Sequence, residues 1–246
     1  LFAMKNTVTL LFSLLCFSGF AQEISDFSDD KNMVKWNVLG LTSSTISLQY
    51  ERLIAPKTSI AANINIMPKR SIPFFGTVED IVKDKGAIDI LKDVKMNAFS
   101  FTPEVRFYLG KEGMRGFYIA PFLRYDRFSV ELPVEYIYKE QLESVTINGN
   151  VDGFSGGLSF GAQWRLASQW YLDVTFVGLS YGFASGELSG RRSLNTEEQA
   201  EVRKAIEEVE LPVVKYTYEV KDDGVDVKIK GPWANAKLAV AVGYRF

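Results

Sequence analysis

The chain has 246 residues and a formal net charge of −2, with 28 basic and 30 acidic side chains. This balance gives no electrostatic case for binding nucleic acid. The sequence contains no histidine and one cysteine. These counts exclude general-base catalysis by an imidazole, a disulfide framework and a metal site built from cysteines. We therefore expect a protein that is not an enzyme and that carries no metal or other cofactor.

Residues 1–21 have the composition of a secretory signal peptide. Lys5 precedes a short apolar run, and Ala21 supplies the small residue at which such a segment is cleaved. The first three residues are expected to lie upstream of the natural start. Residues 22–33 are acidic and aperiodic, which predicts a short periplasmic leader after cleavage.

The rest of the chain alternates repeatedly between apolar and polar residues, which is the pattern of strands. Each segment can cross a bilayer as a tilted strand of roughly 9–11 residues, and no apolar run reaches the roughly 18 of a spanning helix. Only helices and closed barrels satisfy backbone polar groups in lipid. We therefore predict an all-β, antiparallel, up-and-down transmembrane β-barrel over residues 34–246. The eight predicted strands are residues 34–42, 45–54, 58–67, 95–109, 117–130, 146–166, 170–188 and 233–246.

Two prolines fall inside predicted strands, where each removes a ladder donor. Pro103 and Pro121 therefore predict local bulges.

Short connections alternate with long ones along the chain. The short turns are residues 54–57, 110–116 and 167–169, and the long loops are residues 68–94, 131–145 and 189–232; the link at 42–44 is tight. Outer-membrane barrels have short periplasmic turns and long extracellular loops. An eight-stranded barrel of this kind has both termini in the periplasm.

The last long loop has its own periodicity. Thr196-Glu-Glu-Gln199 resembles a capping box, and apolar residues follow at helical spacing, which predicts a helix of about 12 residues. Residues 78–93 suggest a second short helix. Residues 213–230 alternate around Asp222-Asp-Gly224, which indicates a hairpin. If that hairpin joined the sheet, the barrel would have ten strands.

Aromatic residues gather on the predicted lipid-facing side, close to the periplasmic strand ends. This position is typical of the aromatic girdle at a membrane interface. The girdle residues are Trp36, Tyr50, Phe107, Phe117, Trp164, Trp170 and Tyr244.

Charged residues share the opposite, inward-facing phase of the strands. On the lipid side an Arg or Lys at mid-bilayer would cost roughly 2–4 kcal/mol, so these residues are expected to point inward. The main charged residues are Lys35, Glu51, Glu104, Arg106, Arg124, Asp126, Arg165, Asp173 and Arg245, with Gln49, Gln163 and Lys237 in the same phase. We expect the three acids Glu51, Glu104 and Asp173 to face Arg106, Arg165 and Arg245. The cluster is either a packed, salt-bridged plug or the lining of a narrow polar pathway or small-ligand site.

Four segments carry a family resemblance. The segments Ser18–Gln22, Trp36–Gly40 with Leu48–Arg52, and Val242–Phe246 together resemble a small, uncharacterised outer-membrane β-barrel of Gram-negative bacteria, distantly similar to the OmpA barrel and OmpX. The resemblance implies outer-membrane lipid as a partner. It also implies assembly by the insertion machinery, with Tyr244 and Phe246 as the insertion signal. It implies no substrate.

The sequence thus predicts a non-enzymatic, integral outer-membrane barrel with a structural or surface-interaction role. Loops 68–94 and 189–232 are the expected contacts for an external protein or surface. A narrow channel or small-solute transporter is one alternative. A soluble periplasmic β-sandwich or lipocalin-like binder is the other.

Overall fold

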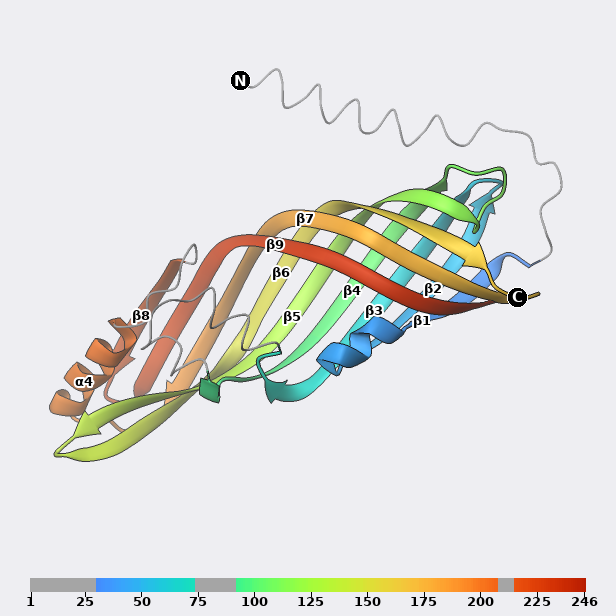
Figure 1. Ribbon diagram of the computed structural model, residues 1–246. Helices are drawn as coiled ribbons and strands as arrows, with labels where there is room; N and C mark the ends of the chain where they lie inside the picture. Colours follow the sequence, from blue (N-terminus) through green and yellow to red (C-terminus); the bar gives the residue numbers. More distant parts are fainter. Residues whose placement is uncertain (1–29, 74–91, 208–214) are drawn as a thin grey trace, which may run out of the picture.

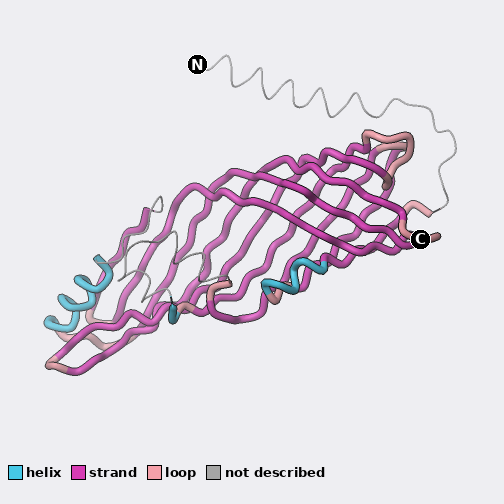
Figure 2. Tube along the Cα trace, viewed as in Figure 1, coloured by secondary structure: helices cyan, strands magenta, loops and turns pink. Residues whose placement is uncertain are grey.

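A computed structural model describes residues 30–73, 92–207 and 215–246, so the predicted signal peptide and most of the predicted 78–93 helix lie outside the described residues. Strands make up most of the trace (Figure 2). The elements are β1 (Asn32–Asn37), the 3₁₀ helix η2 (Val38–Ser43), β2 (Ile46–Ala55), β3 (Thr58–Ser71), β4 (Lys95–Tyr108), β5 (Gly116–Tyr138), β6 (Gln141–Arg165), β7 (Trp170–Arg191), α4 (Thr196–Glu207), β8 (Lys215–Lys221) and β9 (Gly224–Arg245).

The strands form one antiparallel sheet that closes into a barrel (Figure 1). Each strand from β1 to β6 pairs with the next, β7 pairs with β9, and β9 pairs with β1 from Arg245 opposite Met33 to Ala241 opposite Asn37. The predicted eight-stranded barrel is confirmed. The predicted hairpin is also confirmed, but β8 pairs only with the start of β9 and does not enter the ring.

The two ends of the barrel differ. One end, called here the terminal rim, holds Asn32, Phe246 and the short turns that link β2 to β3, β4 to β5 and β6 to β7. The opposite end, the loop end, carries α4, β8 and the β5–β6 hairpin (Figure 1).

The prediction of a long loop at residues 131–145 is wrong. Strands β5 and β6 pair without interruption up to Tyr138 opposite Gln141. The chain reverses through Lys139 and Glu140, whose φ angles are +48° and +64°, the left-handed geometry of a two-residue hairpin turn. The two strands thus project beyond the barrel.

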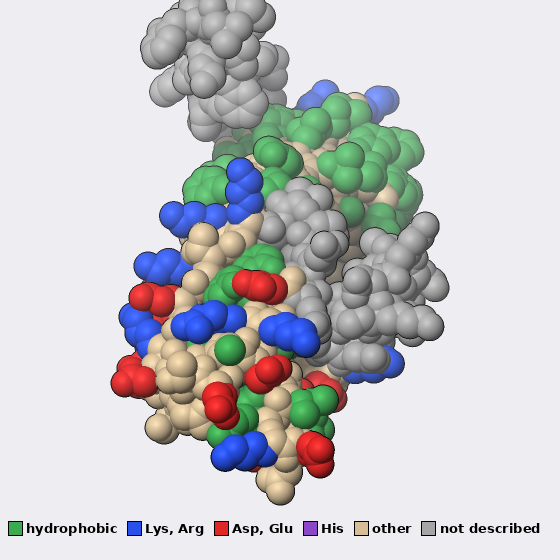
Figure 3. All heavy atoms as spheres, turned by 90° about the vertical axis from the view of Figure 1, so that its left-hand side faces the viewer, with side chains coloured by type: hydrophobic (Ala, Val, Ile, Leu, Met, Phe, Trp, Pro, Cys, Tyr) green, Lys and Arg blue, Asp and Glu red, His purple; other side chains and the backbone are tan. Residues whose placement is uncertain are grey.

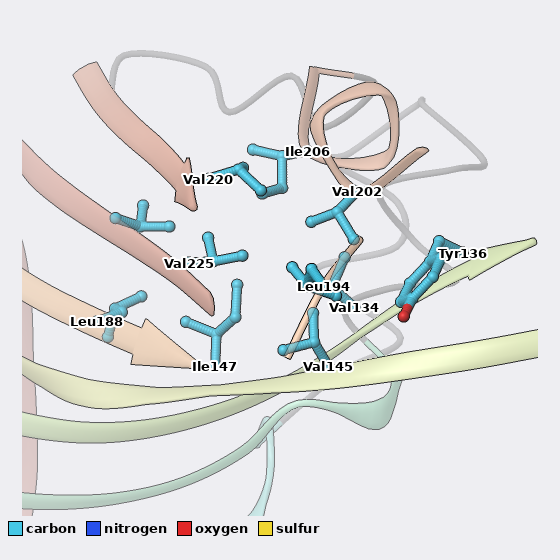
Figure 4. Packing of buried hydrophobic residues seen from close by; sticks show 11 residues of the cluster. Val134, Tyr136, Val145, Ile147, Leu188, Leu194, Val202, Ile206, Val220 and Val225 are labelled. Carbon is cyan, nitrogen blue, oxygen red and sulfur yellow. The ribbon is translucent and has the colours of Figure 1, made fainter. Parts of the chain in front are cut away.

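A second hydrophobic core explains this projection. The inward side chains of the β5–β6 hairpin pack against α4, β8 and the start of β9 (Figure 4). The buried residues are Val134, Tyr136, Val145, Ile147, Leu188, Leu194, Val202, Ile206, Val220, Val225 and Val227. We call the structure built around this core the loop-end extension.

The predicted helix in the last loop is confirmed as α4, but its capping box lies one residue earlier than expected. The Asn195 Oδ1 accepts hydrogen bonds from the backbone N–H groups of Glu197 and Glu198, each at 3.0 Å. The Glu198 carboxylate accepts one from the Asn195 backbone N–H at 2.9 Å. These reciprocal bonds satisfy donors that the first helical turn leaves free.

The first predicted strand ends early. Residues 38–43 form η2 instead of continuing β1. The Asn37 side chain accepts a hydrogen bond from the Leu39 backbone N–H at 3.1 Å, and such local bonds compete with the strand ladder. Ser44 then adopts φ +51° and returns the chain into β2.

The prediction of bulges at the two prolines is wrong. Around Pro103, Phe101 lies opposite Tyr125 and Glu104 opposite Phe122, so no residue is inserted. Pro121 pairs with Leu158 in an unbroken register. The register shifts lie elsewhere. They fall between Leu53 and Ala55 in β2, between Met67 and Arg70 in β3, and in β7, whose pairing with both β6 and β9 changes between Thr175 and Gly178.

Candidate functional site

A buried network of charges fills the barrel next to the terminal rim. Lys35 forms ion pairs with Glu51 and Asp173. Arg106 lies between them, with Nη1 2.5 Å from Asp173 and Nε 2.6 Å from Glu104. All five side chains are buried, so the five predicted residues from β1, β2, β4 and β7 do meet in one cluster.

The network has equal numbers of acids and bases. Lys237 Nζ lies 2.6 Å from Glu104, which makes three cations for three carboxylates. The predicted facing of the acids with Arg106 is seen, and the predicted inward residues Gln49 and Gln163 also bond Arg106. An ion network of this kind offsets the desolvation of its members only when every charge is paired, and here every charge is.

Two tyrosines that the sequence did not single out complete the network. Tyr108 donates to Glu51 at 2.6 Å, and Tyr118 donates to Asp173 at 2.8 Å. The Arg106 guanidinium also lies 4.3 Å from the centre of the Tyr118 ring. Both tyrosines share the inward phase of their strands with charged neighbours, which is the signal that could have identified them.

Four other predicted residues do not join this cluster. Arg124 pairs with Asp126 at 2.7 Å, and the Trp233 indole donates to the same carboxylate at 3.0 Å. Arg165 donates to the backbone carbonyl of Ser168 at 2.7 Å, and Arg245 donates to that of Asp30 at 2.8 Å. The predicted facing of the acids with Arg165 and Arg245 is therefore wrong, because Arg165 binds the β6–β7 turn and Arg245 binds the segment before β1, both at the terminal rim.

An apolar plug lies beneath the charge network. Met114 folds in from the β4–β5 turn with φ +58° and is fully buried. Its backbone carbonyl accepts a hydrogen bond of 2.7 Å from Gln163, which ties the turn to the network. The plug residues are Met33, Leu53, Tyr108, Met114, Tyr118, Ala120 and Tyr171. Among the described residues, the barrel interior is closed at this rim.

A chamber of about 620 Å³ lies on the other side of the network. Arg106, Asp173 and Lys237 border it, and uncharged polar side chains from β2, β3 and β4 line its wall. Volumes of roughly 300–1,000 Å³ are typical of small-molecule sites. The chamber, and not the network itself, is the part of the interior that has room for a ligand.

The outer wall of the barrel is apolar. Its exposed side chains include Leu48, Ile64, Phe101 and Leu158. Seen from the loop end, hydrophobic atoms cover the barrel, while charges cover the loop-end extension (Figure 3). All seven predicted girdle residues are exposed on this wall, and Trp170 packs against Tyr244 with ring centres 5.3 Å apart. Their arrangement at one membrane level stays a prediction.

The described residues contain no helix long and apolar enough to cross a membrane.

Comparison with known proteins gives a family and a set of similar folds. The family model described as a protein of unknown function, DUF3575, matches residues 7–206. No protein with a curated description matches the sequence. The structure is similar to CarO2 of Acinetobacter baumannii (10% identity, 88% of this chain and 98% of that chain, TM-score 0.41). It is also similar to a major outer membrane protein of Thermus thermophilus (13%, 89% and 100%, TM-score 0.42). A third similar structure is the translocator domain of the autotransporter NalP from Neisseria meningitidis (9%, 98% and 98%, TM-score 0.32).

Proposed function

This chain belongs to DUF3575, a family of proteins of unknown function, and on that premise we propose its role from its own geometry. It is an integral outer-membrane β-barrel that does not act as an enzyme. Its barrel is a sealed anchor, and its loop-end extension meets a protein or surface outside the cell.

The observation that carries the membrane placement is the inverted distribution of side chains in the barrel wall. Along β2, Leu48 and Tyr50 are exposed by 49% and 42%, while Gln49 and Glu51 between them are exposed by 7% and 0%. In water this arrangement would be unfavourable, because apolar side chains would stay exposed to solvent while charged side chains lose their hydration. In lipid it is the stable arrangement, because the lipid replaces the missing apolar partner.

The geometry also supports an orientation. The start of β1, the end of β9 and the short turns lie together at the terminal rim, which in this class of barrel faces the periplasm. Insertion by the outer-membrane machinery, with Tyr244 and Phe246 as the signal, is part of the same proposal.

The loop-end extension suits an external contact. It has its own hydrophobic core and ion pairs on its surface, such as Arg192 with Glu143 at 2.7 Å. The hydrogen bond from Arg192 to Glu143 raises the pKa of that guanidinium. A platform that is already rigid loses little entropy when a partner binds. Loops 68–94 and 189–232 remain the proposed contact regions.

The channel alternative predicts a different electrical behaviour. Because the plug and the charge network close the terminal rim, the purified protein in a planar lipid bilayer is expected to show no discrete conductance steps. A general porin, inserted from the same detergent, is the control for membrane quality. Discrete, reproducible steps from this protein would replace the sealed anchor with the narrow channel.

A further inference from the structure

The barrel wall has an incompletely paired stretch. On one edge, β9 pairs with β8 up to Lys230 and with β1 from Ala241 onward. Among the described residues, no strand pairs with that edge between Gly231 and Val240. An unpaired backbone edge is costly in hydrocarbon, where water is absent. This stretch therefore has to be covered by other groups or lie next to a filled cavity.

The helix η2 covers only the end of this stretch. The Asn37 Oδ1 accepts hydrogen bonds from the backbone N–H groups of Leu39 and Val240, each at 3.1 Å. Successive residues of a strand direct their N–H groups to opposite edges. The backbone N–H and C=O groups of Leu238, Ala236, Ala234 and Pro232 therefore point to the same edge as the Val240 N–H. Of these residues, proline has no N–H that needs a partner.

The chamber extends past this edge. It is lined by Lys237, which points into the barrel, and also by Leu238, whose side chain is 63% exposed on the outer wall. Consecutive side chains of a strand point to opposite faces. A cavity that borders both residues lies along the edge of the strand. Leu39 and Thr42 of η2 line it too, so the chamber lies beside the gap between η2 and β9.

The polar wall of the chamber favours a neutral head group. The cations Arg106, Arg124 and Lys237 are each paired with a carboxylate, so no charge is left for an anion. The wall instead offers hydroxyl and amide groups. One of them, the buried Thr102 Oγ1, has no hydrogen-bond partner in the described part of the chain. A buried hydroxyl without a partner costs free energy that a bound polar group would recover.

We propose that the chamber binds a neutral, single-chain amphiphile. Its hydroxyl-bearing head group lies among Ser47, Ser100 and Thr102, and its apolar chain passes between η2 and β9 into the bilayer. This inference rests on the proposed membrane placement. Because the terminal rim is closed, the site would exchange its ligand between the loop end and the lipid, and not across the membrane.

The test uses the full chain in vesicles of phosphatidylethanolamine and phosphatidylglycerol. The probe is dodecanol with a diazirine in its chain, and labelled peptides are mapped by mass spectrometry. We expect labelling of the chamber-lining peptide from β4 at Ser100 and Thr102. Thr102→Val is expected to weaken this labelling about fivefold, the value of one hydrogen bond. Dodecanoic acid with the same diazirine is expected to label this peptide less than the alcohol.

Two alanines on the outer face of β9 supply a matched pair. Ala236 lines the chamber, while Ala234 is equally small, exposed and on the same edge but does not line it. Ala236→Trp is expected to abolish labelling of the β4 peptide, and Ala234→Trp to leave it unchanged. Equal labelling in both variants, or stronger labelling by the acid, would overturn the proposal. Heat-modifiable migration in electrophoresis reports barrel insertion separately, so loss of the ligand site and loss of the membrane barrel are distinguishable.

Discussion

Replacing Arg106 with leucine is expected to destabilise the folded barrel by about 3–5 kcal/mol, which is the usual cost of breaking a buried ion pair. Arg106 lies between Glu104 and Asp173 and bonds both. Without it, the three buried carboxylates of the network keep only two cations, Lys35 and Lys237, so one buried charge stays uncompensated. Urea unfolding of the reconstituted protein, followed by tryptophan fluorescence, measures the change.

An exposed ion pair provides the control for this substitution. Arg127 lies 2.9 Å from Asp152, and both side chains are exposed. Arg127→Leu is expected to cost far less than Arg106→Leu, because solvent screens surface pairs. If Arg106→Leu cost no more than Arg127→Leu, the interior would be hydrated and the sealed plug would be wrong.

The second large expected effect is the loss of stability when an arginine is placed on the barrel wall, which distinguishes a wall in lipid from a wall in water. Leu158 and Leu142 are both on β6 and are exposed by 57% and 67%. Leu158 lies on the barrel wall, whereas Leu142 lies at the tip of the β5–β6 hairpin. Leu158→Arg is expected to cost about 2–4 kcal/mol, because the charge enters the bilayer. Leu142→Arg is expected to change stability by no more than about 0.5 kcal/mol.

The same unfolding titration in lipid vesicles compares the two variants. A soluble protein would tolerate both arginines equally, since both positions would already be in water. Equal costs for Leu158→Arg and Leu142→Arg would therefore remove the physical basis for placing the barrel wall in lipid.

The sequence was most informative where one strand face had to be apolar. Strict alternation predicted the strands of the barrel and the side-chain facing along β2, β4 and β9, and apolar residues at helical spacing predicted the helix α4. It failed at residues 131–145, because the turn at Lys139 and Glu140 lacks the glycine or asparagine that usually marks a two-residue hairpin. The stabilising partner of that hairpin, α4, lies about 60 residues further along the chain.

The sequence predicted which side chains of the candidate site point into the barrel, but not at which level along the barrel they lie. Alternation correctly predicted that Lys35, Glu51, Glu104, Arg106 and Asp173 point inward. It could not show that Arg165 and Arg245 sit at the terminal rim, where backbone carbonyls are free to accept their hydrogen bonds. The early end of β1 was missed for a similar reason, since the bond from Val240 to Asn37 joins residues far apart in sequence.

The most direct test of the outer-membrane placement is cysteine labelling on intact cells. Ser193 lies at the loop end and Ser168 in the β6–β7 turn at the terminal rim, and both are exposed. The one cysteine of the sequence, Cys16, falls in the predicted signal peptide. A membrane-impermeant maleimide is expected to label Ser193→Cys on whole cells, and Ser168→Cys only after the outer membrane is broken. Labelling of neither variant before the membrane is broken would place the whole protein in the periplasm and contradict the barrel's proposed location.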